Sequence, residues 1–194
     1  DDMIDFAKYA FNKSHAAAYA VVSYQTAFLK YYYPVEYMAA LMTSVIHNPS
    51  KVAEYILSSR KMQIEILPPD INFGESEFSA DHGAIRYGLS AIKSLGAPMI
   101  RAIVEERNEN GKYQSLRDFI ERMSGRELNK RAIENLIKAG ALDQVSGNRR
   151  QKLMVYAEIV DAVNQEKKNA MTGQMSLFDL ISDEEKEAYE IQMP

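Results

Sequence analysis

The stretch Tyr87–Arg107, YGLSAIKSLGAPMIRAIVEER, decides how the middle of this chain folds. Two sets of apolar residues in it have the three- and four-residue spacing of a helix face: Leu89, Ile92 and Leu95, then Ile100, Ile103 and Val104. Between them lies SLGAP, in which Gly96 can take a positive φ and Pro98 suits the first turn of a helix. The stretch therefore predicts a helix, a tight hairpin and a second helix.

Such a hairpin presents unpaired backbone N–H groups at the start of a helix, where a phosphate can bind. The pattern resembles the helix-hairpin-helix motif, which holds nucleic-acid backbones without reading bases. The candidate contacts are the N–H groups of Leu95, Gly96 and Ala97, together with Lys93 and Arg101. The alternative is a plain αα-hairpin inside a helical core.

The charge of the chain is distributed unevenly. The whole sequence has a net charge of -4, but residues 85–152 hold 14 Lys and Arg against 8 Asp and Glu, a net charge of +6. Residues 1–84 have a net charge of -4 and residues 153–194 one of -6. Phosphate binding needs local positive charge, which coincides here with the hairpin. The alternative is that these cations only solvate exposed helix faces.

A second unit of similar design follows at Asn129–Gln165. Ser115 is expected to cap a helix at 116–123. Asn129 is expected to cap a helix that ends at Gly140, and a loop then leads into a helix that begins near Arg149 and ends at Gln165. By analogy, the candidate DNA contacts of this unit are Gly147, Asn148, Arg149 and Arg150. Two such turns in tandem would allow both to face one duplex.

The chain before the hairpin predicts mostly helices. We expect helices at 16–33, 35–46 and 51–62, the first capped by Ser14 and the last by Ser50. Pro34 separates the first two. A β-like segment at 63–67 and a hairpin of strands 77–80 and 84–87 come next. The predicted fold is mainly α: a helical subdomain, a small β-hairpin and a tandem helix-hairpin-helix domain.

Composition narrows the class of protein. The 194 residues include no cysteine, and His15, His47 and His82 have no metal-ligand spacing. Neither a signal peptide nor a membrane span is visible, which predicts a cytoplasmic protein without a membrane partner. The first residues, DDMIDFAKYAF, look like the middle of a helix, so we expect the chain to be a piece of something larger.

The end of the chain has a different character. Lys167–Gly173 is polar and predicts a linker, Gln174–Phe178 is a short apolar island, and Ser182–Glu190 is acidic. The expected domains are therefore residues 1–64, residues 65–165, and a flexible tail of residues 166–194.

Several long stretches resemble one family, that of the bacterial DNA polymerase III alpha subunit, a C-family replicative polymerase. They are FNKSHAAAYAVVSYQTAFLKYYYPVEYMAALM at 11–42, ILPPDIN at 66–72, IRYGLSAIKSLG at 85–96, NKRAIENLIKAGALD at 129–143 and GQMSLFDL at 173–180. The first is similar to the distal fingers of that family, and all occur in the family's order.

The resemblance implies a DNA-directed DNA polymerase that transfers nucleotides with two metal ions, Mg²⁺, held by palm carboxylates. The palm precedes the fingers, and no matching carboxylate motif occurs here; Asp1, Asp2 and Asp5 are better explained as a solvated helix face. We therefore expect no catalytic residue, no metal ligand and no cofactor in this chain, and no polymerase activity from it alone. Its expected partners are duplex DNA, the sliding clamp and the remaining polymerase domains.

The resemblance also implies two further contacts. In the fingers, Lys13, Ser14 and His15 would contact the incoming nucleotide, since a cation, a hydroxyl and an imidazole at a helix start suit phosphate oxygens. The alternative is that Ser14 only caps and His15 only packs.

The segment Gln174, Met175, Ser176, Leu177 and Phe178 is similar to the pentapeptide that docks on the sliding clamp. The alternative is that Leu177 and Phe178 fold back onto the helical domain.

Two other classes of function stay open from sequence. One is a non-catalytic DNA-binding adaptor built from helix-hairpin-helix units, although an adaptor has no need of a fingers element such as FNKSHAAAYA. The other is a purely structural helical domain, which would show no salt-dependent affinity for a duplex.

Overall fold

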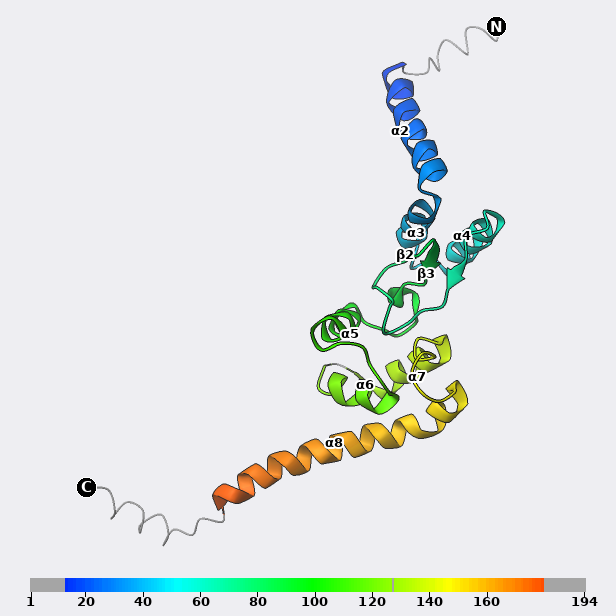
Figure 1. Ribbon diagram of the computed structural model, residues 1–194. Helices are drawn as coiled ribbons and strands as arrows, with labels where there is room; N and C mark the ends of the chain where they lie inside the picture. The colour runs from blue at the N-terminus through cyan, green and yellow to red at the C-terminus, as the bar shows by residue number, and fades with distance from the viewer. Residues whose placement is uncertain (1–12, 127, 180–194) are drawn as a thin grey trace, which may run out of the picture.

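The computed structural model describes residues 13–126 and 128–179 (Figure 1). The helix expected at the first residues lies outside them. The elements are α2 (Lys13–Tyr32), α3 (Pro34–Ser44), α4 (Pro49–Lys61), β1 (Ile66–Leu67), β2 (Ser79–Asp81), β3 (Ala84–Arg86), the 3-10 turn η1 (Leu89–Ala91), α5 (Ala97–Asn110), α6 (Leu116–Met123), α7 (Lys130–Ala139) and α8 (Arg149–Asp179). The mainly α class is confirmed.

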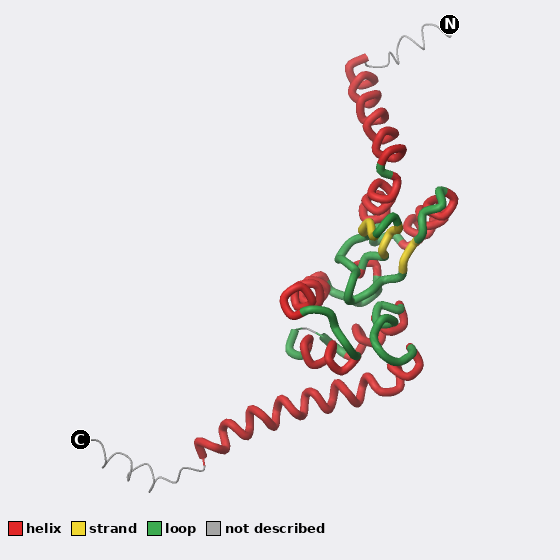
Figure 2. Tube along the Cα trace, viewed as in Figure 1, coloured by secondary structure: helices red, strands yellow, loops and turns green. Residues whose placement is uncertain are grey.

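Two apolar clusters hold the chain together. The first joins α3 and α4 to the small sheet, around Met38, Met42 and Ile85, which are almost fully buried. The second joins η1 with α5, α6, α7 and the first half of α8. Helix α2 projects from the first cluster, and the end of α8 projects from the second, at opposite ends of the molecule (Figures 1 and 2).

The sheet is larger by one strand than the predicted hairpin. β2 and β3 form the expected antiparallel hairpin, in which Ala80 pairs with Ile85. His82 and Gly83 both have positive φ, 50° and 85°, as a tight two-residue hairpin turn requires. β1 adds parallel to β3, with Ile66 opposite Ile85.

Local sequence signals set most helix ends. The side chain of Ser115 accepts a hydrogen bond from the N–H of Asp118, and that of Asn129 accepts one from Ala132, so both predicted caps are confirmed. Gly140 ends α7 in the left-handed conformation, also as predicted.

Two predicted caps are wrong. The side chain of Asn48, not Ser50, caps α4 by accepting from the N–H of Lys51, because Pro49 already occupies the first helical turn. Ser14 lies inside α2, whose described part begins at Lys13.

The helix predicted before the hairpin is replaced by a short 3-10 turn, η1, and an extended Ile92. The reason is a contact with another part of the chain. The N–H groups of Leu89 and Ser90 donate to the carbonyls of Glu75 and Ser76, which lie in the loop before β2. Gly88 lies so close to this loop that a Cβ there would be 2.6 Å from the carbonyl carbon of Glu77. The segment is therefore held against the loop, and the helix does not form.

Helix α8 is longer than predicted. We expected it to end at Gln165 and to be followed by a polar linker, but the backbone stays helical to Asp179. Arg117 on α6 forms an ion pair with Glu166, 2.9 Å between Nη2 and Oε2, and Lys167 donates to the carbonyl of Ser124. Both contacts lie beyond the predicted end and tie this part of α8 to α6.

Candidate nucleic-acid interface

The first hairpin is a loop that leads into an uncapped helix start. Ser94 has a φ of 64°, a left-handed conformation that is uncommon for a residue with a side chain. Gly96 is the N-cap residue of α5, with φ -76° and ψ 146°, and Pro98 lies in the first turn as predicted. The prediction of a positive φ at Gly96 is therefore wrong, because Ser94 makes the turn two residues earlier.

The N–H groups at this helix start are available to a ligand. Ile100 donates the first helical hydrogen bond, to the carbonyl of Gly96, 3.1 Å away. Within the described residues, the N–H groups of Leu95, Gly96 and Ala97 donate to no other group of the chain, and Gly96 and Ala97 are exposed. The dipole of α5 adds partial positive charge there, so the site favours an anion.

In the second turn, side chains accept hydrogen bonds from backbone N–H groups that would otherwise be open to a ligand. The side chain of Asn148 accepts from the N–H of Gln151, and the side chain of Gln151 accepts from the N–H of Asn148, in a reciprocal cap. Gly147 has a φ of 87° and is exposed. The start of α8 therefore offers a ligand fewer open N–H groups than the start of α5.

Arg149 is also used internally. It forms an ion pair with Asp143, 2.5 Å between Nη2 and Oδ2, and donates to the carbonyl of Lys138. The hydrogen bonds from Arg149 hold the pKa of Asp143 below its ordinary value. Of the residues predicted in this turn, exposed Arg150 keeps a side chain without a hydrogen bond or ion pair within the described residues.

Lys152 shapes the second turn, and the sequence analysis missed it. Its side chain is buried, and its Nζ donates to the carbonyls of Leu142, Val145 and Gly147. Burial lowers the pKa of Lys152, as expected for an ammonium group taken out of water. Its position on the first turn of α8, facing a glycine-bearing loop, is the only signal that could have indicated this role.

Most cationic side chains of residues 85–152, called the basic block here, form ion pairs or hydrogen bonds within the chain. The net charge of +6 therefore overstates how many cations are available to a ligand. Among the described residues of 85–152, the exposed cationic side chains that make no hydrogen bond or ion pair are those of Lys93, Arg101, Lys112, Arg131 and Arg150. Lys112 Nζ lies 3.8 Å from the centroid of the Phe73 ring. Lys93, Arg101 and Arg150 were predicted contacts, and Lys112 and Arg131 are additions. Lys93 precedes α5 by four residues and Arg101 begins its second turn, so both add positive charge near this helix start, which favours an anion.

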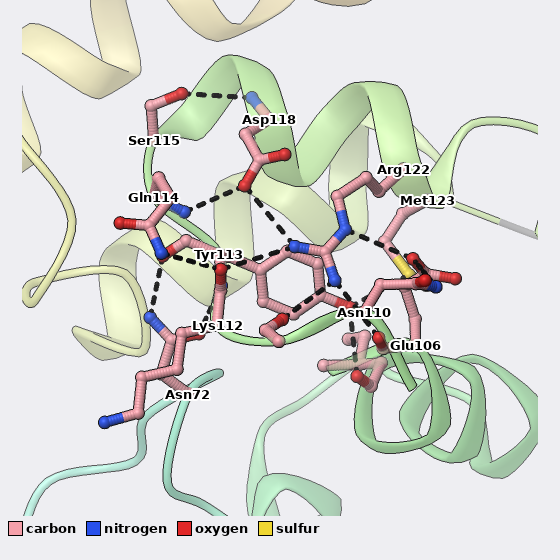
Figure 3. A network of polar contacts seen from close by, with 12 residues as sticks. Asn72, Glu106, Asn110, Lys112, Tyr113, Gln114, Ser115, Asp118, Arg122 and Met123 are labelled. Carbon is pink, nitrogen blue, oxygen red and sulfur yellow. Dashed lines mark hydrogen bonds and ion pairs between the residues drawn. The ribbon is translucent and has the colours of Figure 1, made fainter. Parts of the chain in front are cut away.

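A buried polar network fixes the junction of α5 and α6 (Figure 3). Arg122 lies over the ring of Tyr113, 4.3 Å from its centroid, and donates to Glu106, Gly111 and Lys112. The pKa of Tyr113 is raised to about 12, chiefly by burial. These contacts hold α5 to α6, and the polar groups that make them are used within the chain.

Glu106 is the acidic centre of that network. Burial alone would raise its pKa, but hydrogen bonds from Arg122 and Asn110, with the charge of Arg126, outweigh it and the pKa is lowered. The carboxylate is therefore ionised at neutral pH and shared by two arginines.

The predicted nucleotide contacts lie at the far end of the molecule from the hairpin. Lys13, Ser14 and His15 begin the described part of α2, and only the side chain of His15 is described. The His15 ring lies against exposed Tyr19, 4.4 Å between centroids. The structure does not bring these residues near the hairpins.

The predicted clamp segment lies on the last turns of α8. The backbone of Gln174, Met175, Ser176, Leu177 and Phe178 is helical, and their side chains lie outside the described residues. The predicted contact of Leu177 and Phe178 with either a clamp or the helical domain therefore stays a prediction.

Neither a metal site nor a membrane span was found in the described ranges. Among residues 13–126 and 128–179, no three His, Asp or Glu side chains come close enough together to hold a metal ion. In the same ranges, no helix has the length and apolarity to cross a membrane.

Comparison with known proteins identifies the family. The family model described as "Helix-hairpin-helix motif" matches residues 63–152, which include both turns. The DNA polymerase III subunit alpha of Xylella fastidiosa is 46% identical over 179 residues, and that of Vibrio cholerae 44% over 197 residues, covering 92% and 100% of this chain. The chain spans only 15% and 17% of their lengths. The same name and a 15% share apply to the relative from Chlamydia trachomatis, 42% identical. The chain belongs to the family of the DNA polymerase III alpha subunit and corresponds to a short segment of it.

Proposed function

We propose that this chain binds the backbone of duplex DNA without reading base sequence, as one part of a replicative DNA-directed DNA polymerase. The observation that carries the proposal is the open start of α5, where the N–H groups of exposed Gly96 and Ala97 have no partner among the described residues and the unpaired cations Lys93 and Arg101 stand before and after them in the sequence. Backbone amides and a helix dipole bind phosphate but give no sequence information.

The two turns contribute unequally in this proposal. The first turn holds phosphate oxygens directly through its amides. The second turn contributes Arg150 and the exposed backbone of Gly147, since Asn148 caps its own helix and Arg149 is paired with Asp143. Substitutions in the first turn should therefore lower the affinity for DNA more than substitutions in the second.

The test is fluorescence anisotropy of the 194-residue chain with labelled duplexes of two unrelated sequences at several salt concentrations. We expect similar affinities for both sequences and a steep fall with salt. Ala97→Pro removes one open N–H while keeping a residue that suits the first helical turn, and should weaken binding several-fold. Arg101→Ala should weaken it as well, whereas Arg60→Ala, an exposed position on α4, should not. An affinity that does not change with salt would exclude phosphate binding.

Clamp docking is part of the same proposal. Gln174–Phe178 would dock on the sliding clamp, with Leu177 and Phe178 as apolar anchors and Gln174 at the rim. DNA bound by the basic block would raise the effective concentration of this contact. Pull-down of the cognate clamp by the chain should be lost with Leu177→Ala/Phe178→Ala. Equal retention of clamp by both proteins would show that the segment is not the ligand.

The nucleotide contact of Lys13, Ser14 and His15 completes the proposal. In the intact polymerase, Lys13→Ala should raise the nucleotide KM or lower kcat, because a charge-assisted contact is lost. An unchanged kcat/KM would contradict it. The chain by itself lacks the proposed palm carboxylates and is expected not to extend a primer.

A further inference from the structure

A cavity of about 460 Å³ opens beside the first hairpin, between the end of η1 and helix α7. Its lining combines apolar side chains with two lysines. The lining residues are Pro69, Tyr87, Ala91, Ile92, Lys93, Asn135, Lys138 and Ala139.

Two lysines from distant parts of the sequence meet at this cavity. Lys93 comes from the hairpin loop and Lys138 from α7, and both are exposed. A hydrogen bond of 3.0 Å from Asn135 Nδ2 to the carbonyl of Lys93 holds the two elements together. Left-handed Ser94 directly follows Lys93, three residues before α5 begins.

We propose that this cavity holds one nucleotide unit of a DNA strand, next to the phosphate bound at the start of α5. Lys93 and Lys138 would bind its phosphate, and Pro69, Ala91 and Ala139 would pack against its sugar. The inference rests on the proposed DNA binding and adds α7, through Lys138, to the surface that carries it. It makes Lys138, which no sequence motif indicates, a contact residue for DNA.

Lys138 has a competing partner in the free protein. It forms an ion pair with Glu134, one helical turn earlier on α7. Such a pair between exposed side chains contributes little to stability and is screened by salt, so a phosphate can displace the glutamate. Removal of the glutamate charge should then favour DNA.

Lysine footprinting tests the placement. The chain is acetylated with and without saturating duplex DNA, and modification of each lysine is measured by mass spectrometry. We expect the duplex to protect Lys93 and Lys138, while Lys61, an exposed lysine on α4, stays reactive. Protection of Lys93 without Lys138 would overturn the inference. A free deoxynucleoside triphosphate, at equal phosphate concentration, should protect neither; equal protection by it would assign the cavity to free nucleotides and overturn binding of a strand.

Variants test the energetics. Lys138→Ala should weaken duplex binding roughly 5- to 20-fold at low salt and reduce the slope of log affinity against log salt by about 0.9, the effect of one phosphate contact. Lys61→Ala removes the same charge and should leave affinity within about twofold. Glu134→Gln should tighten binding about two- to threefold, whereas Glu65→Gln, at an exposed position before β1, should not.

The outcomes separate the two proposals. If the duplex binds with a steep salt dependence and Ala97→Pro weakens it, but Lys138→Ala behaves like Lys61→Ala, the hairpin function stands and the cavity proposal is wrong. If the wild-type chain binds no duplex at low salt, both are wrong.

Discussion

Asn135 Nδ2 lies 3.0 Å from the backbone oxygen of Lys93, so a side chain of the second helix-hairpin-helix unit holds the loop of the first. The two units are therefore one surface, in which the position of one hairpin depends on a helix of the other. This contact spans 42 residues of sequence and leaves the Lys93 side chain exposed.

We expect Asn135→Ala to lower the free energy of unfolding by only about 0.5–1.5 kcal/mol, as is usual for one hydrogen bond. Its effect on duplex affinity should be proportionally larger, because the loop that positions Lys93 is released. Urea unfolding and anisotropy measure the two effects. The control is Gln144→Ala, an exposed position in the α7–α8 turn whose side chain makes no hydrogen bond among the described residues. Affinity and stability that fall in the same proportion would indicate a purely structural role.

Lys152→Met should destabilise the chain by about 2–3 kcal/mol. The substitution leaves the carbonyls of Leu142, Val145 and Gly147 without their shared donor in a buried site. The matched control is Lys167→Met on the same helix, where an exposed lysine donates to a single carbonyl, that of Ser124. We expect less than about 0.5 kcal/mol for the control. Equal urea midpoints for the two variants would contradict the role of Lys152 in the turn.

Glu106 should make stability fall in acid. Its pKa in the folded chain is below the ordinary 4.5, so it contributes stability that is fully present above about pH 4.5 and is lost as pH falls through the lowered pKa. Glu106→Gln should cost about 2–3 kcal/mol at pH 7, because Arg122 and Arg126 lose their buried carboxylate.

Urea unfolding between pH 7 and pH 3 measures this effect. The Glu106→Gln variant should lose less further stability in acid than the wild type. The exposed neighbour Glu105→Gln is the control and should follow the wild-type profile. Parallel profiles for wild type and Glu106→Gln would mean that another carboxylate causes the acid sensitivity.

Gly88, before the first hairpin, and Gly96, within it, should differ in how well they tolerate alanine. In Gly88→Ala the new Cβ would lie 2.6 Å from the carbonyl carbon of Glu77 and 2.8 Å from the nitrogen of Phe78, so the backbone must move. We expect a loss of about 2 kcal/mol or more. In Gly96→Ala the nearest atom is Pro98 Cδ at 3.7 Å and the φ is negative, so the loss should stay below about 1 kcal/mol. Thermal unfolding of both variants checks the order; a larger loss for Gly96→Ala would show that the loop is packed differently.

Local signals in the sequence determined most helix boundaries. Ser115, Asn129 and Gly140 act on N–H or carbonyl groups within four residues of themselves, so their roles can be predicted without knowing what packs on the helix. The apolar spacing of Ile100 and Ile103 likewise identified a face of α5 that is buried. The long stretches shared with the polymerase family identified the chain itself.

Contacts between distant segments decided the rest. Whether Leu89–Ile92 becomes a helix depends on the carbonyls of Glu75 and Ser76, which the sequence does not place beside it. Whether Arg149 is free for DNA depends on Asp143, and Lys152 is buried because the turn closes over it. Sequence can therefore count the cations of the basic block, but only tertiary packing determines which of them, such as Lys93 and Arg101, stay exposed to a phosphate. The physical reason is that helix caps are satisfied within one turn of the chain, whereas a charge is neutralised by whichever group folding brings within hydrogen-bonding distance.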